Sequence, residues 1–332
     1  MELMSKPCSL SSTPQNDVMT DGWQGQLSLE FDYIKDQVPT AEANGTTRLI
    51  HNHGIAPLKV QRPFYPEGPH ICHSVVVHTA GGMVGGDRLN LSVDLHPSAH
   101  ALVTTAAASK VYKSNGQTAR QSTRITIGQG GYLEWFPQPL ILFNGAQYHQ
   151  DLRIDLAPGA IWMGWDITRL GRTLRQESFE HGVWRSRIEV WQDNYPLWID
   201  PQWIQGGSEM LTSSHGLDHC PVMGTFAIVG LEVNEDTVHQ SRQLWVNTIG
   251  SDSKEPWQSI PGKEVQGEQN RSSSGVSQLQ LGLICRYRGH STIVAQHWFM
   301  AVWHLLRQGY LSRPSCIPRV WQINQRSHPY RG

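Results

Sequence analysis

The densest run of chemistry-bearing residues begins at His78 and reads HTAGGMVGGDRLNLSVDL. Two glycine pairs, Gly81-Gly82 and Gly85-Gly86, precede Asp87-Arg88, and alternating apolar residues follow. A phosphate-binding loop would need a helix after the glycines and, in the Walker pattern, Gly-Lys-Ser/Thr. Here a carboxylate and a strand pattern follow instead. The run therefore predicts a turn where two pieces of backbone approach closely, with Asp87 and Arg88 holding the loop or lining a passage.

Two groups of histidine and cysteine residues offer metal-ligand chemistry. In HICHSVVVH, His70 and Cys72 share one face of a predicted strand, and in SSHGLDHCP a predicted loop carries His215, His219 and Cys220. Imidazole and thiolate suit nickel and zinc, but neither group has the spacing of a closed four-ligand zinc site. Both are weak candidates for metal binding, and the alternative is that they are polar residues of ordinary turns.

Catalytic motifs do not accompany these groups. The sequence contains no G-x-S-x-G and no H-E-x-x-H, and the carboxylates Glu134, Asp166 and Glu177 are spread along it. A pair for acid–base catalysis therefore cannot be assigned from spacing. The sequence favours a protein that is not an enzyme. A metal-dependent hydrolase built on the histidine and cysteine clusters is the alternative, and the 13 tryptophans suggest a further one, a β-solenoid module that binds polysaccharide.

The composition narrows the class of protein. The 332 residues carry a net charge of -1 without a Lys/Arg-rich run, which argues against a nucleic-acid partner. No apolar run approaches the roughly 20 residues that cross a bilayer, so no membrane partner is expected. The five cysteines lack a C-x-x-C pair, as expected for reduced thiols in the cytoplasm. Residues 1–20 lack the apolar core of a signal peptide and are expected to form a disordered tail.

Strands dominate the pattern from Trp23 to about Ile249. Alternation of apolar and polar residues predicts strands at 26–31, 90–95, 123–127, 152–156, 186–191 and 226–233. Three of them enter a strand–turn–strand plan whose turns start at His96, Gly128 and Ala157, about 30 residues apart. Such a period predicts either stacked solenoid layers or a series of unrelated hairpins.

The strand pattern does not continue in the C-terminal part of the sequence. Residues 250–278 are rich in Ser, Gly, Gln and charge, which predicts a flexible insertion. A strand at 279–287 and a helix from Ser291-Thr292 to Gly309 follow. We expect one stripe of the helix to pack on the sheet: Val294, His297/Trp298, Ala301 and Leu305. Phe299 and Trp303 lie off that stripe and would leave apolar surface for a partner.

Six segments, in order, resemble the urease accessory protein UreD family, also called UreH. They read TRLIHNHGIAPLKVQRPFY, GGMVGGDRL, TTAAASKVYKS, LEWFPQPLILFNGA, LGRTLRQESFEHG and PRVWQ. The resemblance covers about Trp23 to Gln322, nearly the whole chain. The resemblance implies a mainly β fold of helically stacked, β-solenoid-like sheets with one or two helices near the C-terminus. It also implies a single domain over residues 21–325, interrupted by the insertion at 250–278.

The resemblance implies a role in urease maturation. Proteins of this family assist assembly of the dinickel centre of urease, in a complex with UreF and the GTPase UreG on apo-urease, and nickel is thought to pass through an internal tunnel. No tightly bound cofactor is implied, only transient Ni²⁺. The C-terminal helix and the PRVWQ segment are the first candidates for contact with UreF.

The resemblance also implies roles for particular residues. Those of the family motif are Gly81, Gly82, Gly85, Gly86, Asp87, Arg88 and Arg172, and those expected along the nickel path are Asp87, Glu134, Asp166 and Glu177. For Glu177, an ion pair with Arg172 or Arg175 is the alternative. At Pro139 and Asn144 the sequence departs from acidic positions of the family pattern, which thins the acidic lining of the implied path.

Overall fold

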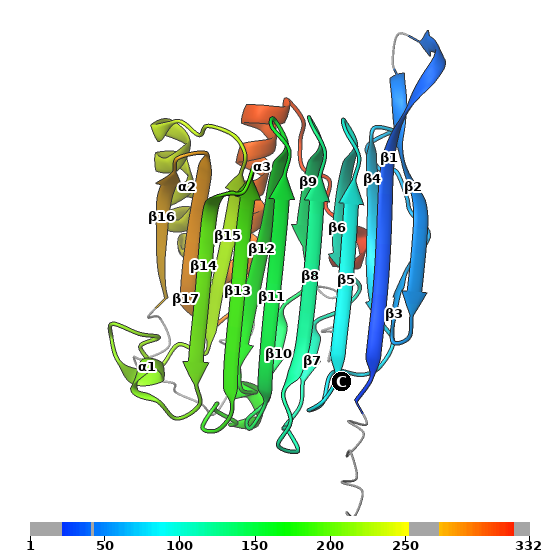
Figure 1. The fold of residues 1–332 in the computed structure, drawn as a ribbon. Coiled ribbons are helices and arrows are strands. Elements are labelled where there is room, and N and C mark those ends of the chain that lie inside the picture. Colours follow the sequence, from blue (N-terminus) through cyan, green and yellow to red (C-terminus); the bar gives the residue numbers. More distant parts are fainter. Residues whose placement is uncertain (1–21, 41–42, 252–271, 322–332) are drawn as a thin grey trace, which may run out of the picture.

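The computed structural model describes residues 22–40, 43–251 and 272–321, which form two β-sheets lying face to face with helices over the outer face of one (Figure 1). Sheet A has the strand order β14-β13-β11-β8-β5-β1-β2. Its strands, in chain order, are β1 (Gln24–Thr40), β2 (Ala43–Ile55), β5 (Arg88–Leu95), β8 (Ala119–Ile127), β11 (Gln147–Leu156), β13 (Val183–Gln192) and β14 (Tyr195–Gln205).

Sheet B has the order β16-β17-β15-β12-β9-β6-β4-β3, with β7 and β10 attached beside β12. Its strands are β3 (Leu58–Val60), β4 (Ile71–His78), β6 (His100–Thr105), β7 (Ser109–Val111), β9 (Tyr132–Phe136), β10 (Leu140–Leu142), β12 (Ile161–Leu170), β15 (Val222–Val229), β16 (Ser273–Leu279) and β17 (Gly282–Gly289). The helices are η1 (Thr173–Arg175), α1 (Glu209–Thr212), α2 (Glu235–Ser251) and α3 (Thr292–Leu311).

The chain winds between the sheets as a solenoid. It passes from sheet A to sheet B in the steps β5–β6, β8–β9 and β11–β12, and the strands of successive coils pair in parallel within each sheet. The turns occupy equivalent places, because the N–H of Gly128 donates to Leu95 O at 2.7 Å and that of Ala157 donates to Ile127 O at 2.8 Å. The expected stacked layers are therefore confirmed, and unrelated hairpins are not.

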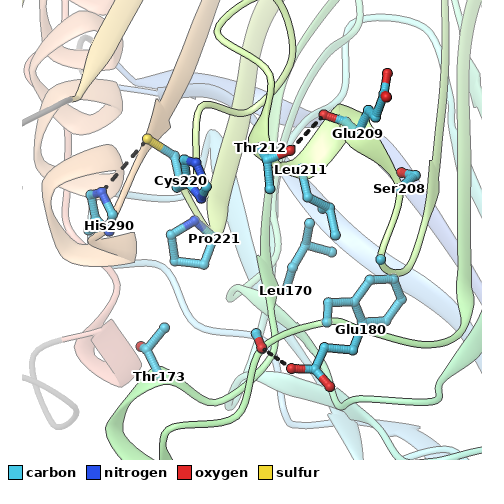
Figure 2. A pocket seen from close by; sticks show the side chains of 14 residues that line it. Leu170, Thr173, Glu180, Ser208, Glu209, Leu211, Thr212, Cys220, Pro221 and His290 are labelled. Carbon is cyan, nitrogen blue, oxygen red and sulfur yellow. Dashed lines mark hydrogen bonds between the residues drawn. The ribbon is translucent and has the colours of Figure 1, made fainter.

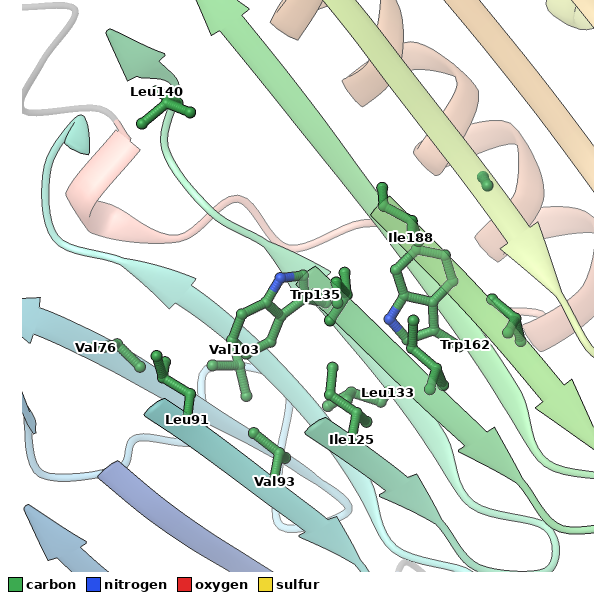
Figure 3. Close-up of a cluster of buried hydrophobic side chains, with 14 of the residues drawn as sticks. Val76, Leu91, Val93, Val103, Ile125, Leu133, Trp135, Leu140, Trp162 and Ile188 are labelled. Carbon is green, nitrogen blue, oxygen red and sulfur yellow. The ribbon is translucent and has the colours of Figure 1, made fainter. Parts of the chain in front are cut away.

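Apolar ladders between the sheets hold the coils together. Val93, Ile125, Ile154 and Val190 lie side by side on β5, β8, β11 and β13 and are all buried. Trp135 and Trp162 of sheet B pack in the same core, as Figure 3 shows. Strands β5 and β8 alternate buried and exposed residues because sheet A has one face in water, whereas β9 is buried throughout because helices cover sheet B.

Helix α3 begins as expected but buries a different face. The Ser291 side chain accepts a hydrogen bond from Val294 N, so the predicted cap is present. Trp298 is buried as predicted, but Val294, Ala301 and Leu305 are only half-buried. The fully buried residues are Ala295, Trp298, Phe299, Val302, Trp303, Leu306 and Arg307. The stripe prediction was wrong because α3 packs against both sheet B and α2, so a wider face is covered and Phe299 and Trp303 are not left for a partner.

Other boundaries also differ from the sequence prediction. Helix α2 occupies a stretch expected to be strand, and β15 stops at Val229 rather than Val233. The strand expected at 279–287 is broken by a turn between β16 and β17. Of the expected insertion, the flanks belong to α2 and β16, while residues 252–271, like the expected tail 1–20, lie outside the described residues.

Candidate functional site

A cavity of about 320 Å³ lies between the two sheets. Strands β5, β8 and β11 form one wall, strands β4, β9 and β12 the other, and Asp166, Gln150 and Tyr148 face into it. Its other lining includes the loop residues Gly81–Met83 and the stretch Ala106–Lys110, which leads into β7; Gly81 and Lys110 are exposed. The cavity therefore reaches from the interior of the solenoid to the glycine-rich loop that the sequence singles out.

Asp166 is the ionisable residue at the inner end of this cavity. On β12 the side chains alternate, so that Trp162 and Asp166 point toward sheet A while Trp165 points toward the helices. Gln150 Nε2 donates to Asp166 Oδ2 at 2.7 Å, and the Thr168 hydroxyl donates to Asp166 Oδ1 at 3.3 Å. Burial raises the pKa of Asp166 to about 6, against the lowering effect of the two hydrogen bonds.

The cavity offers further polar atoms. Gln138, itself 7% exposed, lines it, and its Nε2 has no hydrogen-bond partner among the described residues. The Tyr148 hydroxyl lies 3.4 Å from Gln150 Oε1 and 3.3 Å from Gln121 Oε1. A carboxylate with amide and hydroxyl oxygens binds divalent cations weakly compared with thiolates, which suits passage of an ion rather than its retention.

A second polar group joins the edge strand β14 of sheet A to β17 of sheet B, where the Arg286 side chain is partly exposed. Arg286 donates two hydrogen bonds to the carboxylate of Asp200, at 2.6 and 2.7 Å, and one to Thr225 Oγ1 at 2.7 Å. The charge of Asp200 contributes to the raised pKa of Asp166. Asp200 is thus paired already, whereas Asp166 has only neutral hydrogen-bond donors in the described part of the chain.

The glycine-rich loop makes the close approach that the sequence predicts. A Cβ on Gly82 would lie 2.7 Å from Lys110 O, and Gly86 has φ +96°. Buried Asp87 holds the loop, because its Oδ2 accepts from Val84 N and its Oδ1 from Trp23 N, both at 2.8 Å. Arg88 is exposed on the outer face of sheet A.

Glu177 forms the ion pair that the sequence left as an alternative. Arg172 contacts both of its carboxylate oxygens, and Asn144 N donates to Glu177 Oε1 at 3.1 Å. The guanidinium also stacks on Phe143 at 4.1 Å. Hydrogen bonding to Arg172 is the main reason that the pKa of Glu177 is lowered. A role for Glu177 on a nickel path stays a prediction.

Glu134 lies on the opposite face of sheet B from the cavity. It is fully buried beneath α3, where Trp303 Nε1 donates to its Oε1 at 2.6 Å and Arg307 Nε donates to the same oxygen at 2.9 Å. Burial raises the pKa of Glu134, and Arg307 lowers it. Glu134 does not line the cavity with Asp166, and its expected role on the nickel path stays a prediction.

The histidine and cysteine candidates are not brought together. Cys72 is buried in the core, where burial raises the pKa of its thiol, and His70 stacks on Tyr33. His219 and Cys220 line a separate cavity of about 570 Å³, where Cys220 Sγ lies 3.8 Å from His290 Nε2 (Figure 2); His215 is not among the residues lining it. Within residues 22–40, 43–251 and 272–321, no group of three or more His, Cys, Asp or Glu residues is placed to hold a metal ion. The inter-sheet cavity, although smaller, is therefore the stronger candidate site.

The sequence analysis missed Gln138, Gln150 and Asp200. A signal was present for Gln150, because it occupies an inward position of QYHQDLRIDL where the alternation calls for an apolar residue. The same holds for Asp200 in YPLWIDPQWIQ. Gln138 lies in a loop and carried no such signal.

Comparison with known proteins gives a consistent result. Residues 24–322 match the family described as UreD urease accessory protein. A urease accessory protein UreD of Nostoc punctiforme is 48% identical over 308 residues, which are 93% of this chain and 99% of the relative. One of Thermosynechococcus vestitus is 45% identical over 301 residues, 90% of this chain and 98% of the relative. The urease accessory protein UreD 2 of Brucella anthropi is 32% identical over 303 residues, 91% and 99% of the two chains. In the described part of the chain, no helix is long and apolar enough to span a membrane.

Proposed function

The chain belongs to the UreD family of urease accessory proteins, and from this premise we propose that it is a scaffold and metallochaperone of urease maturation. It binds UreF and the GTPase UreG on apo-urease, in the cytoplasm, and assists insertion of nickel into the urease active site. It catalyses no reaction of its own and holds no cofactor tightly. Ni²⁺ is its transient cargo.

The observation that carries this proposal is Asp166 in the inter-sheet cavity. Among the described residues Asp166 has no cationic partner, and a buried carboxylate of this kind is costly to keep in a folded protein. Its presence at a cavity-facing position of β12 therefore calls for a function. Beside it, Gln150 donates its Nε2 hydrogen to Asp166, which leaves the Oε1 atom as a further oxygen ligand. The few oxygen ligands bind Ni²⁺ loosely enough to release it.

Protons compete with the cation at this position. With a pKa of about 6, Asp166 is mostly ionised at neutral pH and mostly neutral at pH 5. Nickel passage through the cavity should therefore weaken as pH falls through 6.

The experiment is co-expression of this chain with UreF, UreG and urease, followed by pull-down of the complex and nickel analysis of the purified urease. The test variant is Asp166→Asn, which keeps the shape and an oxygen acceptor for Gln150 but removes the charge. The control is Asp94→Asn, an exposed carboxylate on the outer face of β5.

We expect a normal complex in all cases and nickel-poor urease with Asp166→Asn alone. Normal nickel content with Asp166→Asn would remove Asp166 from the path. Failure of the unaltered chain to form a complex, with urease nickel unchanged when the chain is omitted, would overturn the maturation role itself.

A further inference from the structure

One row of three arginines, a histidine and a tryptophan crosses the outer face of sheet A. Arg88 on β5 is paired in register with Arg120 on β8, which is paired with His149 on β11. His149 is paired with Arg185 on β13, and Arg185 with Trp203 on the edge strand β14. Residues paired in register point to the same side of a sheet, so the five side chains form one line. At about 4.8 Å between strands, the line is roughly 19 Å long.

The arginines of this row have no acidic partner in the part of the chain that the structure describes. Among the described residues, no ion pair joins Arg88, Arg120 or Arg185 to a carboxylate. Other arginines on the same strands do have acidic partners. Arg153 on β11 contacts Asp155 at 2.7 Å, and Arg187 on β13 contacts Glu189. Like charges on neighbouring strands repel each other, so the unpaired row weakens the sheet and is not explained by folding.

The electrostatic field of the row is felt by its central member. The pKa of His149 is lowered, first by partial burial and then by the charges of Arg120 and Arg185, while Asp151 on the same strand opposes the change. Partial burial and the cations on both sides therefore favour the neutral form of His149.

An exposed apolar edge adjoins the cations. Trp203, which ends the row, is 64% exposed, and Ile199 on the same face of β14 is 37% exposed. Trp and Arg are the residue types that contribute most to binding at protein–protein interfaces, and an uncovered edge strand is itself prone to association.

We infer that the row Arg88–Arg120–His149–Arg185, with Trp203 at its end, is a docking surface for an acidic face of a partner protein. The inference rests on the proposed function, because it takes that partner from the urease maturation complex. A flat row of side chains fits a folded protein surface better than a small molecule, which needs a concave site. A nucleic acid is disfavoured because the far ends of the same strands carry Asp94 and Asp155 on the same face.

The place of the row supports this assignment. Arg88 directly follows the loop that lines the inter-sheet cavity, and Arg120 N donates to Asp87 O at 2.8 Å. A partner bound to the row would therefore lie beside the loops through which the cavity reaches the surface.

The test compares two double charge reversals that change the net charge equally. Arg120→Glu/Arg185→Glu alters the row, and Lys59→Glu/Arg62→Glu alters exposed cations elsewhere. Purified UreF, UreG and apo-urease are each assayed for association with the unaltered chain and both variants, at low and high ionic strength. If Arg120→Glu/Arg185→Glu lowers the yield of folded protein, Arg120→Gln/Arg185→Gln replaces it.

We expect the row variant to slow association with one of the three proteins at least about tenfold and to reduce the salt dependence of that rate, while the control variant changes neither. Equal association by both variants would overturn the docking surface and leave the maturation role intact. Loss of RNA binding in place of protein binding would also overturn it. If the unaltered chain binds none of the three proteins, the proposed function fails and the docking surface fails with it.

Discussion

Arg307 on helix α3 and Glu134 on strand β9, 173 positions apart in the chain, are joined by a hydrogen bond of 2.9 Å from Nε to Oε1, and solvent reaches neither side chain. The other side of the guanidinium contacts Glu67, with Nη1 donating to Oε2 at 2.6 Å. His73 Nε2 lies 2.7 Å from Glu67 Oε1. This network fastens α3 to sheet B by charge as well as by apolar contact.

Removal of the cation should destabilise the whole domain. Arg307→Met leaves the buried carboxylate of Glu134 without a counter-charge and takes from the partly buried Glu67 its arginine partner, leaving it His73. We therefore expect a loss of about 3–5 kcal/mol in the free energy of unfolding. Urea denaturation measures it. The matched control is Arg124→Met, whose side chain is 69% exposed and lies 3.9 Å from Asp155, and which should cost less than about 1 kcal/mol. Similar losses in the two variants would show that the buried network does not hold α3.

Asp166 should make stability depend on pH in a direction unusual for a carboxylate. Its pKa is raised from 3.8 to about 6 in the folded protein, so the folded state binds the proton more tightly than the unfolded chain. Its contribution is therefore most favourable below about pH 4 and is lost as pH rises through 6. Asp166→Asn should be more stable than the unaltered chain at pH 7.5, by about 1–2 kcal/mol, and equal to it near pH 4. Urea midpoints at both values decide this, and a less stable variant at pH 7.5 would contradict the argument.

We expect that Asp87 stabilises the fold and that its removal lowers the free energy of unfolding. Asp87→Ala deprives the N–H groups of Val84 and Trp23 of their acceptor, and we expect a loss of about 2–4 kcal/mol. Asp87→Asn retains one acceptor oxygen and should lose less. Thermal unfolding of both variants, beside exposed Asp94→Ala, measures the difference. An Asp87→Ala chain of normal stability would mean that the loop is held by other contacts, and a nickel defect in it would then point to the cation path.

The solenoid could be predicted as one of two alternatives, beside unrelated hairpins, because its cause is local and repeated. The turns at His96, Gly128 and Ala157 recur at nearly constant spacing, and each returns the chain to a strand with the same alternation. Parallel stacking then places Val93, Ile125 and Ile154 side by side, which a period in the sequence already implies.

The rest depends on contacts between distant segments. The buried face of α3 could not be predicted from the helix's own apolar pattern. That face combines an aromatic residue, Trp303, with a charged one, Arg307, and both are buried because they donate to Glu134 on β9. The cavity likewise needs Asp166 and Gln150 to face each other across two sheets, a relationship fixed by the turns between them and not by either strand alone.

Glycine can be required for its backbone conformation or because a Cβ would collide with a neighbour, and two glycines with the same φ allow these reasons to be tested separately. Gly182 and Gly116 both have φ +107°, so an alanine at either position adopts an unfavourable left-handed conformation, at a cost of about 1–2 kcal/mol. At Gly116 an added Cβ meets nothing within 4 Å, whereas at Gly182 it would lie 2.2 Å from the carbonyl oxygen of Ala146. That oxygen also accepts the hydrogen bond of Val183 N at 2.9 Å, so it cannot move freely. Gly182→Ala should therefore lose clearly more stability in urea than Gly116→Ala. Equal losses would mean that the backbone conformation alone matters and that the approach to Ala146 relaxes without cost.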